Sequence, residues 1–425
     1  MKHQLSAVVL AHTLAMSMGS TAFAQTSADI SQTGQGNAAY AEQVENSGTS
    51  ISAAIVQSGS NNRAGDPDSG TVSGAAGGIW QKGNHGNTTA EVRQAGNSNL
   101  GMVTQEGVTG KYARVTQLGS SNTGAIAQQG GSGGGAALTQ TGDEHTASIT
   151  LRANPRSNPI YNSGVVEVSQ FSQGNQAQVV HRGPGKTTVV QAGSYNTAKL
   201  DSQASLVRNL AVEQYGRNNT VSANSLGSVR QYGAGNSAML LGDPNTFRGS
   251  SELYGTQGDI VQMGNDNNAT INQRGSAGDG VGSIDQLGSS NIASIATGGR
   301  YGGRTQIEQR GYANSASIMQ GSFQAGNVSI SQQGTGHAST VQQRGFGLEQ
   351  ASTLQVGGDN TADIVQEANY DDALISQEGY RNRAVVAQGG YEGYANVARI
   401  YQQGNDFQAA IRQDGAGNRA VIRQR

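Results

Sequence analysis

The chain has 425 residues, contains no cysteine and carries a formal net charge of −2 at pH 7. The lack of cysteine excludes a disulfide framework, and the balanced charge gives no reason to expect nucleic acid as a partner. Charged residues make up 13% of the chain and aromatic residues 5%, whereas glycine occurs 63 times, a composition typical of disordered chains. The residues nevertheless follow a regular period, and this period predicts a folded repeat protein.

The N-terminal segment has the features of a secretory signal peptide. Lys2 provides a basic start, residues 5–18 are largely apolar, and small residues stand at Ala22 and Ala24. We therefore predict a signal peptide over residues 1–24, with cleavage after Ala24. The alternative is a first core helix. The apolar run is too short for a comfortable membrane span, and no other stretch of the chain is a candidate for one.

The repeats follow in three sections. We predict a first repeat array over residues 25–150, irregular repeats with loop excursions over residues 151–260, and a regular array over residues 261–425. Between Gln57 and Gln81 the pattern is lost, and a surface loop is expected there. Proline cannot donate to a β-ladder. In agreement with this, the five prolines all fall outside the strand pattern, at Pro67, Pro155, Pro159, Pro184 and Pro244.

The end of the chain shows the repeat unit most clearly. Asn418, Ala420, Ile422 and Gln424 stand at every second residue, which places them on one face of a strand. Glutamines recur eleven residues apart, and a glycine two residues after each glutamine, such as Gly415, supplies a turn. Two such arcs make one coil of about 22 residues, and the coils stack into an all-β, amyloid-like β-solenoid.

Stacking brings identical polar residues into register. A buried amide without a partner costs roughly 1–3 kcal/mol, and stacked glutamines and asparagines satisfy one another. The predicted ladder residues are Gln355, Asn360, Gln366, Gln377, Asn382, Gln388, Gln402, Gln413, Asn418 and Gln424. The predicted turn glycines are Gly357, Gly379, Gly404 and Gly415.

The segment from Gln377 to Gln388 resembles the curlin repeat, whose core is Gln-x-Gly-x-x-Asn-x-Ala-x-x-x-Gln. The resemblance implies a subunit of curli-type functional amyloid, secreted by a Gram-negative bacterium and assembled outside the cell into fibres of the biofilm matrix. It also implies other curlin-type subunits, a secretion pore and accessory chaperones as partners, besides the chain itself. Both the major and the nucleating subunit of the family fit, and the basic residues near the C-terminus are similar to those of the nucleating subunit.

Two other classes of protein compete with a fibre subunit. A β-helix enzyme acting on polysaccharide needs clustered carboxylates, and the sequence has neither such a cluster nor a nucleophile beside a base. We therefore expect no enzymatic activity and no cofactor. A monomeric adhesive solenoid would repeat one outward residue, whereas the outward residues here differ between arcs. A fibre subunit needs open ends, and the strand pattern continues to the last residues without room for a polar cap.

The remaining motifs fit the repeat. Glycine-rich stretches at residues 131–135 and 298–304 open no helix, so we interpret them as turns rather than phosphate or RNA loops. The histidines after the predicted signal peptide are scattered along the chain. His145 and His337 occupy the asparagine position of their arcs, which favours a role in the ladder over metal binding.

Overall fold

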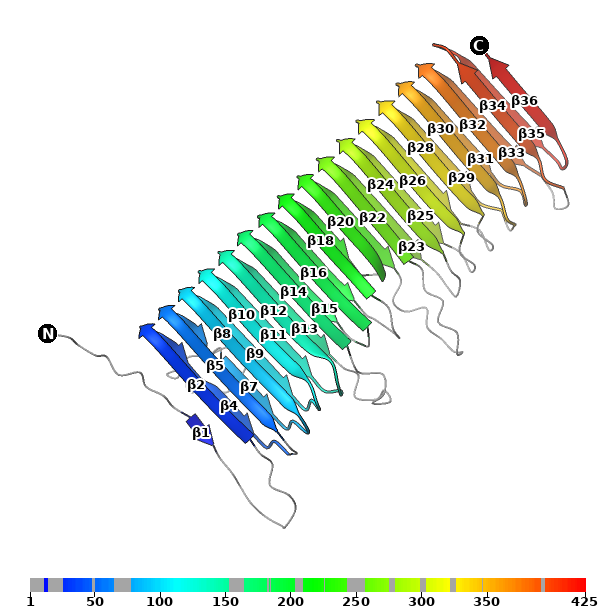
Figure 1. Cartoon of the computed structure of the whole chain (residues 1–425). Coiled ribbons are helices and arrows are strands. Elements are labelled where there is room, and N and C mark those ends of the chain that lie inside the picture. Colours follow the sequence, from blue (N-terminus) through cyan, green and yellow to red (C-terminus); the bar gives the residue numbers. More distant parts are fainter. Residues whose placement is uncertain are drawn as a thin grey trace. The chain divides into compact units, whose positions relative to one another are not determined.

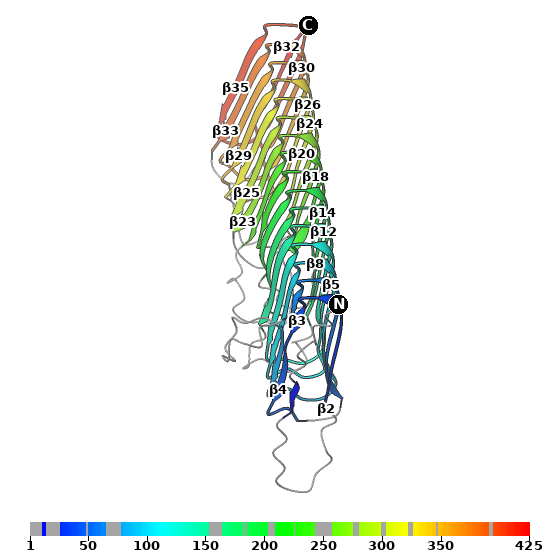
Figure 2. The same ribbon diagram turned by 90° about the vertical axis from the view of Figure 1, so that its left-hand side faces the viewer.

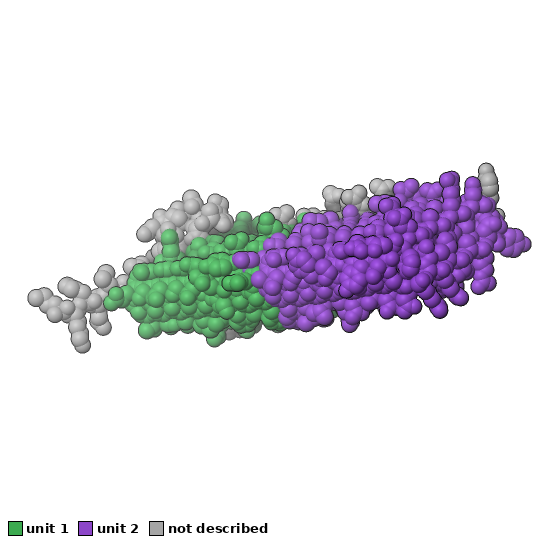
Figure 3. All heavy atoms as spheres, turned by 90° about the horizontal axis from the view of Figure 1, so that it is seen from above, with its two compact units in different colours: residues 1–217 green, residues 218–425 purple. Residues whose placement is uncertain are grey.

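Each of the two compact units of this protein is a β-solenoid. The units are Met1–Arg217 and Asn218–Arg425, coloured separately in Figure 3. The computed structural model describes residues 11–13, 26–47, 50–64, 78–152, 164–181, 183, 185–202, 209–224, 226–242, 257–274, 280–298, 303–321, 326–345, 347–390 and 394–425. The described residues are all-β, and about 23 residues make one coil of parallel strands, which confirms the predicted fold class. The predicted sections that meet at residues 150 and 260 stay a prediction.

Unit 1 consists of two parallel sheets (Figure 1). Its sheet I contains β2 (Thr26–Gln35), β5 (Ile51–Ser60), β8 (Thr88–Asn97), β10 (Tyr112–Ser120), β12 (Gly135–Asp143), β14 (Gly164–Gln173), β16 (Gly185–Ser194) and β18 (Asn209–Arg217), paired in that order. Its sheet II contains β1 (Ala11–Thr13), β3 (Ala38–Ala39), β4 (Ala41–Val44), β6 (Arg63–Ala64), β7 (Gly78–Lys82), β9 (Leu100–Glu106), β11 (Thr123–Gln129), β13 (Thr146–Arg152), β15 (Gln176–His181) and β17 (Thr197–Ser202).

Unit 2 repeats this plan, and its two sheets form facing layers in Figure 2. Sheet I contains β20 (Leu226–Ala234), β22 (Gln257–Asn265), β24 (Val281–Ser289), β26 (Arg304–Tyr312), β28 (Asn327–Thr335), β30 (Gln350–Gly358), β32 (Asp372–Tyr380), β34 (Val397–Gln403) and β36 (Arg419–Gln424). Sheet II contains β19 (Thr220–Ala223), β21 (Ser237–Gly242), β23 (Asn268–Arg274), β25 (Ile292–Gly298), β27 (Ser315–Gln320), β29 (Ala338–Gln343), β31 (Thr361–Gln366), β33 (Arg383–Gly389) and β35 (Gln408–Asp414).

The core lies between the two sheets of each unit. Buried and accessible residues alternate along the strands, as a half-buried strand requires. A typical strand turns a small residue, a β-branched aliphatic residue and a glutamine inward. Ile284, Ile307 and Ile330 are fully buried and lie in register on β24, β26 and β28. Like side chains therefore stack on like, coil after coil.

The two turns of a coil differ, which the sequence did not predict. The tight turn leads from a sheet I strand to the next sheet II strand and passes through a column of glycines, in which Ser172 on β14 takes one position. The variable turn leads from sheet II back to sheet I and accommodates extra residues. Ladder partners are 23 residues apart where the turn is short, as for Gln332 and Gln355, and 30 apart for Gln140 and Gln170. The repeat is thus a coil with two distinct arcs rather than a series of equal arcs.

Several sequence predictions fall on residues outside the described ranges. All five prolines do, and so do residues 65–77 of the surface loop predicted between Gln57 and Gln81. The described parts of that stretch are mostly strand rather than loop, because residues 58–64 and 78–80 contain the end of β5, the strand β6 and the start of β7. Of the predicted signal peptide, the description covers Ala11–Thr13, which forms the short strand β1 parallel to β4. Among the described residues, no helix has the length and apolar character needed to cross a membrane.

Candidate assembly site: amide ladders, glycine column and terminal strands

A column of glutamines runs through sheet I of each unit. In unit 2 each side chain donates Nε2–H to Oε1 of the glutamine in the following coil, at 2.8–2.9 Å. The second amide hydrogen crosses the interior, as from Gln377 to the carbonyl of Thr361 at 3.0 Å. Both donors are satisfied, so the column ties neighbouring coils together and also ties sheet I to sheet II. The members in unit 2 are Gln231, Gln262, Gln286, Gln309, Gln332, Gln355, Gln377, Gln402 and Gln424.

The predicted glutamines form two columns, one in each sheet, as a coil of two arcs requires. Gln366, Gln388 and Gln413 lie in sheet II, where Gln366 donates to Gln388 at 3.1 Å and Gln388 donates to Gln413 at 2.9 Å. This second column is shorter, because Thr297 aligns with Gln320 on the neighbouring strand. The eleven-residue spacing therefore alternates between the sheets, while each column repeats about every 23 residues.

An asparagine column follows the tight turn. The main-chain N–H of Asn382 donates to Oδ1 of Asn360 at 3.0 Å, and Nδ2 of Asn382 donates to the carbonyl of Gly404 at 2.7 Å. Each asparagine thus fixes the turn of its own coil and that of the following coil. Asn418 lies in the variable turn instead, where its N–H donates to Oδ1 of Asn396 at 3.0 Å.

Histidine replaces asparagine in this column without breaking it. Nε2–H of His337 donates to the carbonyl of Gln333 at 3.1 Å, and Nδ1 accepts the N–H of Asn360 at 3.4 Å. Burial lowers the pKa of His337, so the ring stays neutral and Nδ1 keeps its lone pair. His145 has the same position in unit 1, where its Nδ1 accepts the N–H of Asn175 at 3.3 Å.

The glycine column explains why the tight turn admits almost no side chain. Gly357 and Gly379 have φ of +112° and +116°, in the left-handed region. A methyl group on Gly357 would lie 2.1 Å from the carbonyl oxygen of Gly379, and one on Gly379 would lie 1.9 Å from that of Gly404. Gly404 also belongs to this column, whereas Gly415 lies in the variable turn of the last coil. A methyl group on Gly390, its counterpart one coil earlier, would lie 2.1 Å from the carbonyl oxygen of Gly415, but the nearest atom to a methyl group on Gly415 itself is 3.8 Å away.

The outermost strands of sheet I expose the same inward pattern in both units. β2 of unit 1 carries Ala28, Ile30 and Gln32 on its inner face, and β36 of unit 2 carries the matching residues Ala420, Ile422 and Gln424. These six side chains are only half-buried, whereas Ile400, on the strand beside β36, is fully buried. Each terminal strand therefore exposes an Ala-x-Ile-x-Gln face on which a further strand with the same pattern could stack.

The two terminal strands also have complementary hydrogen-bonding polarity. Gln32 donates Nε2–H to Gln57, which leaves its Oε1 directed away from the column as an acceptor. Gln424 accepts from Gln402 through Oε1, and its Nε2 is the donor at the other terminus. In sheet II, β4 already pairs with an added parallel strand, because β1 aligns Ala11 with Ala41 and Thr13 with Gln43. The sequence alignment Ala-x-Ile-x-Gln in β2 and β36 was a signal that could have identified these strands.

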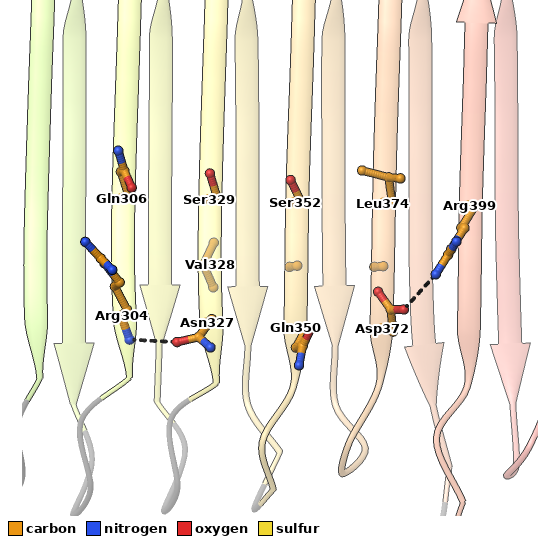
Figure 4. A pocket seen from close by; sticks show the side chains of 12 residues that line it. Arg304, Gln306, Asn327, Val328, Ser329, Gln350, Ser352, Asp372, Leu374 and Arg399 are labelled. Atoms are coloured by element: carbon orange, nitrogen blue, oxygen red, sulfur yellow. Dashed lines mark hydrogen bonds and ion pairs between the residues drawn. The ribbon is translucent and has the colours of Figure 1, made fainter.

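A shallow groove of about 460 Å³ crosses the outer face of sheet I in unit 2 (Figure 4). It forms because Ser329 and Ser352 are small, whereas Gln306 and Leu374 beside them on the outer strands are long. Arg399 Nη2 lies 3.2 Å from Oδ2 of Asp372 at one end. The lining carboxylate is thus held in an ion pair. Within the described residues, no three His, Cys, Asp or Glu side chains are arranged to hold a metal ion.

The fold and this geometry define the protein as a two-sheet parallel β-solenoid with internal amide ladders. No family model matches the chain, and no curated protein matches it.

Proposed function

We propose that the chain is a secreted structural subunit that assembles with copies of itself into curli-like extracellular amyloid fibres. The observation that carries this proposal is the pair of terminal strands β2 and β36. They expose the same Ala-x-Ile-x-Gln inner face with opposite hydrogen-bonding polarity. Unpaired strand edges are templates for a further strand, and here the edge of one copy complements that of the next.

The proposed contact continues the solenoid from one copy into another. β36 of one copy pairs in parallel with β2 of the next, with Ala420 on Ala28, Ile422 on Ile30 and Gln424 on Gln32. In sheet II, β35 lies one strand position before β36, so it is two positions from β4 of the next copy, and β1 has the position between them. Each contact buries two half-exposed isoleucines and adds one rung to the glutamine column. Repeating one head-to-tail contact generates an open filament rather than a closed oligomer.

The curlin-like repeat supplies the biological setting of the proposal. The Gln-x-Gly-x-x-Asn array implies export through an outer-membrane pore, help from accessory chaperones, and fibres that mediate adhesion and aggregation in a biofilm. The glycine and asparagine columns support the resemblance, since the fixed glycine and the fixed asparagine of the motif each have a separate physical task in the tight turn. A monomeric β-solenoid adhesin is the second candidate, because the groove on sheet I offers a surface for a ligand. Neither role requires catalysis.

Seeded elongation of the mature chain, residues 25–425, distinguishes the two candidates. The fibre proposal predicts a change from disordered to β-rich after dilution from denaturant, with a lag that preformed fibres abolish and with filaments visible by electron microscopy. Cross-seeding of another repeat protein from the same cell would assign the nucleating role. A β-rich monomer that never elongates would favour the adhesin and refute the fibre.

A further inference from the structure

Two acidic residues occupy an amide column in the variable turn of unit 2. The residue immediately before each of the last sheet I strands lies in this column, whose members in order are Glu349, Asp371, Asn396 and Asn418. Glu349 and Asp371 are both 0% exposed and belong to successive coils. Neighbouring strands are about 4.8 Å apart, so two buried carboxyl groups follow each other at about one strand spacing.

The asparagines show what this column requires of its side chains. Asn418 donates its main-chain N–H and Nδ2–H to Oδ1 of Asn396, at 3.0 and 3.1 Å. Asn396 donates its main-chain N–H to Oδ1 of Asp371 at 3.0 Å, and its Nδ2–H to the carbonyl of Gly415 at 2.9 Å. Each rung therefore needs one acceptor atom and one donor atom. An amide has both, whereas an ionised carboxylate has no donor.

Each carboxyl group leaves one oxygen without a partner. Oδ1 of Asp371 acts as the acceptor, but within the described residues Oδ2 has no hydrogen-bond partner. Gly390 is the counterpart of Gly415 one coil earlier, so the register directs Oδ2 toward the Gly390 carbonyl. Oε2 of Glu349 also lacks a partner, while its Oε1 accepts the N–H of Gly347 at 3.4 Å. A proton on each free oxygen would supply the missing donor.

The charges on the adjoining turns and strands are paired with one another at the surface. Arg344 and Glu367 are 3.7 Å apart and both are exposed, and Arg399 pairs with Asp372 at 3.2 Å. The phenols of Tyr370 and Tyr394 are exposed as well. The buried carboxyl groups therefore face each other rather than a cation. Burial, with a smaller contribution from Asp371, raises the pKa of Glu349 to about 7, and burial also raises the pKa of Asp371.

We propose that Glu349 and Asp371 form a proton-binding step in this column, which tightens the last coils of unit 2 in acid and loosens them in alkaline solution. Protonated carboxyl groups have the shape and the donor of the amides beside them. Asp371 precedes β32, which is two strands from the terminal strand β36. Protonation of the pair therefore regulates the stability of β36, the strand used in the proposed fibre contact. Only that last consequence rests on the proposed function, since the effect on stability is a property of the folded chain.

The sign of the effect follows from proton linkage. A carboxyl group whose pKa is higher in the folded chain binds more protons there, so stability falls as pH rises through the interval between the two pKa values. For Glu349 this interval runs from 4.5 to about 7. Proton release from Glu349 then lowers the folded-to-unfolded ratio by about 150-fold between pH 4.5 and pH 8.5. The buried histidines act oppositely, because burial lowers the pKa values of His145, His181 and His337.

The test compares the mature chain with the double variant Glu349→Gln, Asp371→Asn by urea denaturation monitored through β-sheet circular dichroism, from pH 4.5 to 8.5. This signal reports on the protein whether it is monomeric or assembled. We expect the double variant to be the more stable at pH 8.5 and its advantage to vanish at pH 4.5. Because the histidines are common to both proteins, their effect cancels in the difference. A control with the exposed pair Glu378→Gln, Asp414→Asn should show no pH-dependent difference.

Three outcomes would overturn the proposal. A difference between the double variant and the mature chain that does not vary with pH would show that the carboxyl groups bind no proton in this range. If CaCl₂ at pH 8.5 stabilises the mature chain but not the double variant, the free oxygens hold a cation instead. If the double variant fails to fold, infrared spectra of the unsubstituted protein decide, since absence of a protonated carboxyl band at pH 5.5 contradicts the proposal. Failure to form fibres would leave all these results unchanged and would refute only the proposed function.

Discussion

Replacing Gly379 by alanine tests the glycine column against a matched substitution in the same unit. The new methyl group would lie 1.9 Å from the carbonyl oxygen of Gly404, well inside van der Waals contact. Gly415→Ala is the control, because Gly415 also has a positive φ, +98°, but the nearest atom to its methyl group is 3.8 Å away. The two variants share the conformational strain and differ in the close contact.

The magnitude can be worked out from the contacts of Gly404. An alanine in a left-handed conformation costs about 1–2 kcal/mol, which applies to both variants. To relieve the contact, Gly404 must move by more than an ångström. It then loses the bond from its N–H to the carbonyl of Glu378, 2.9 Å, and the bond from Asn382 Nδ2, 2.7 Å. At about 1 kcal/mol for each bond, we expect about 3–4 kcal/mol for Gly379→Ala and about 1–2 kcal/mol for Gly415→Ala.

Native-state hydrogen exchange of the amides in β32 and β34 measures this difference locally. About 3–4 kcal/mol corresponds to a loss of protection of roughly 200- to 1,000-fold for Gly379→Ala, against roughly 10-fold for the control. Equal losses in the two variants would refute the close-contact argument and leave only the backbone conformation as the reason for glycine. A larger loss in Gly415→Ala would contradict the destabilising effect assigned to the contact with the following coil.

Three further predictions concern the ladder and the termini. Gln332→Glu removes the two buried hydrogen bonds that Nε2 donates, to Gln355 Oε1 at 2.8 Å and to the carbonyl of Ser315 at 2.9 Å, and introduces a charge, so it should lower the free energy of unfolding by about 3 kcal/mol or more. Gln333→Glu, at the exposed neighbouring residue, should change this free energy by less than about 0.5 kcal/mol, and urea denaturation measures both variants. Ile422→Lys should stop elongation by placing a charge in the proposed contact while the coils before it stay folded; normal growth rates in a seeded assay would argue against that contact. Finally, the chain that retains residues 1–24 should elongate faster than residues 25–425, because β1 fills the sheet II position between β35 of one copy and β4 of the next, and equal seeded rates would argue against this register.

The fold class could be predicted from the sequence because its signal is strictly periodic. Alternation along each strand and the regular glutamines indicate stacked parallel strands, and the structure has them. The sequence could not show that Gly379 and Gly415 occupy different turns. The same Gln-x-Gly motif occurs in both arcs, and successive carbonyl groups approach closely in both. A methyl group on Gly379 would lie 1.9 Å from the carbonyl oxygen of Gly404, and one on Gly390 would lie 2.1 Å from that of Gly415. The eleven-residue spacing is also the same in both arcs, so it does not tell which glutamines belong to sheet I and which to sheet II.

The burial of the carboxyl pair Glu349 and Asp371 could not be predicted from the sequence. Acidic residues are normally solvated, so Glu349 and Asp371 are not expected in a core. Their position was the available signal, since each stands six residues before a sheet I glutamine, as Asn396 and Asn418 do. Recognising it requires knowing which glutamines belong to sheet I, and that follows from the pairing of strands rather than from the eleven-residue period.

Directed cross-linking tests the proposed head-to-tail contact most directly. In the proposed register Arg423 on β36 of one copy lies beside Ser31 on β2 of the next, and both side chains are exposed on the outer face. Adjacent strands about 4.8 Å apart are within the range of a disulfide, and the chain contains no other cysteine. The account predicts that fibres of the variant Ser31→Cys, Arg423→Cys oxidise into covalent multimers, whereas Ser31→Cys, Gln403→Cys fibres do not. Fibres that form normally but yield no multimers from the first variant would contradict it.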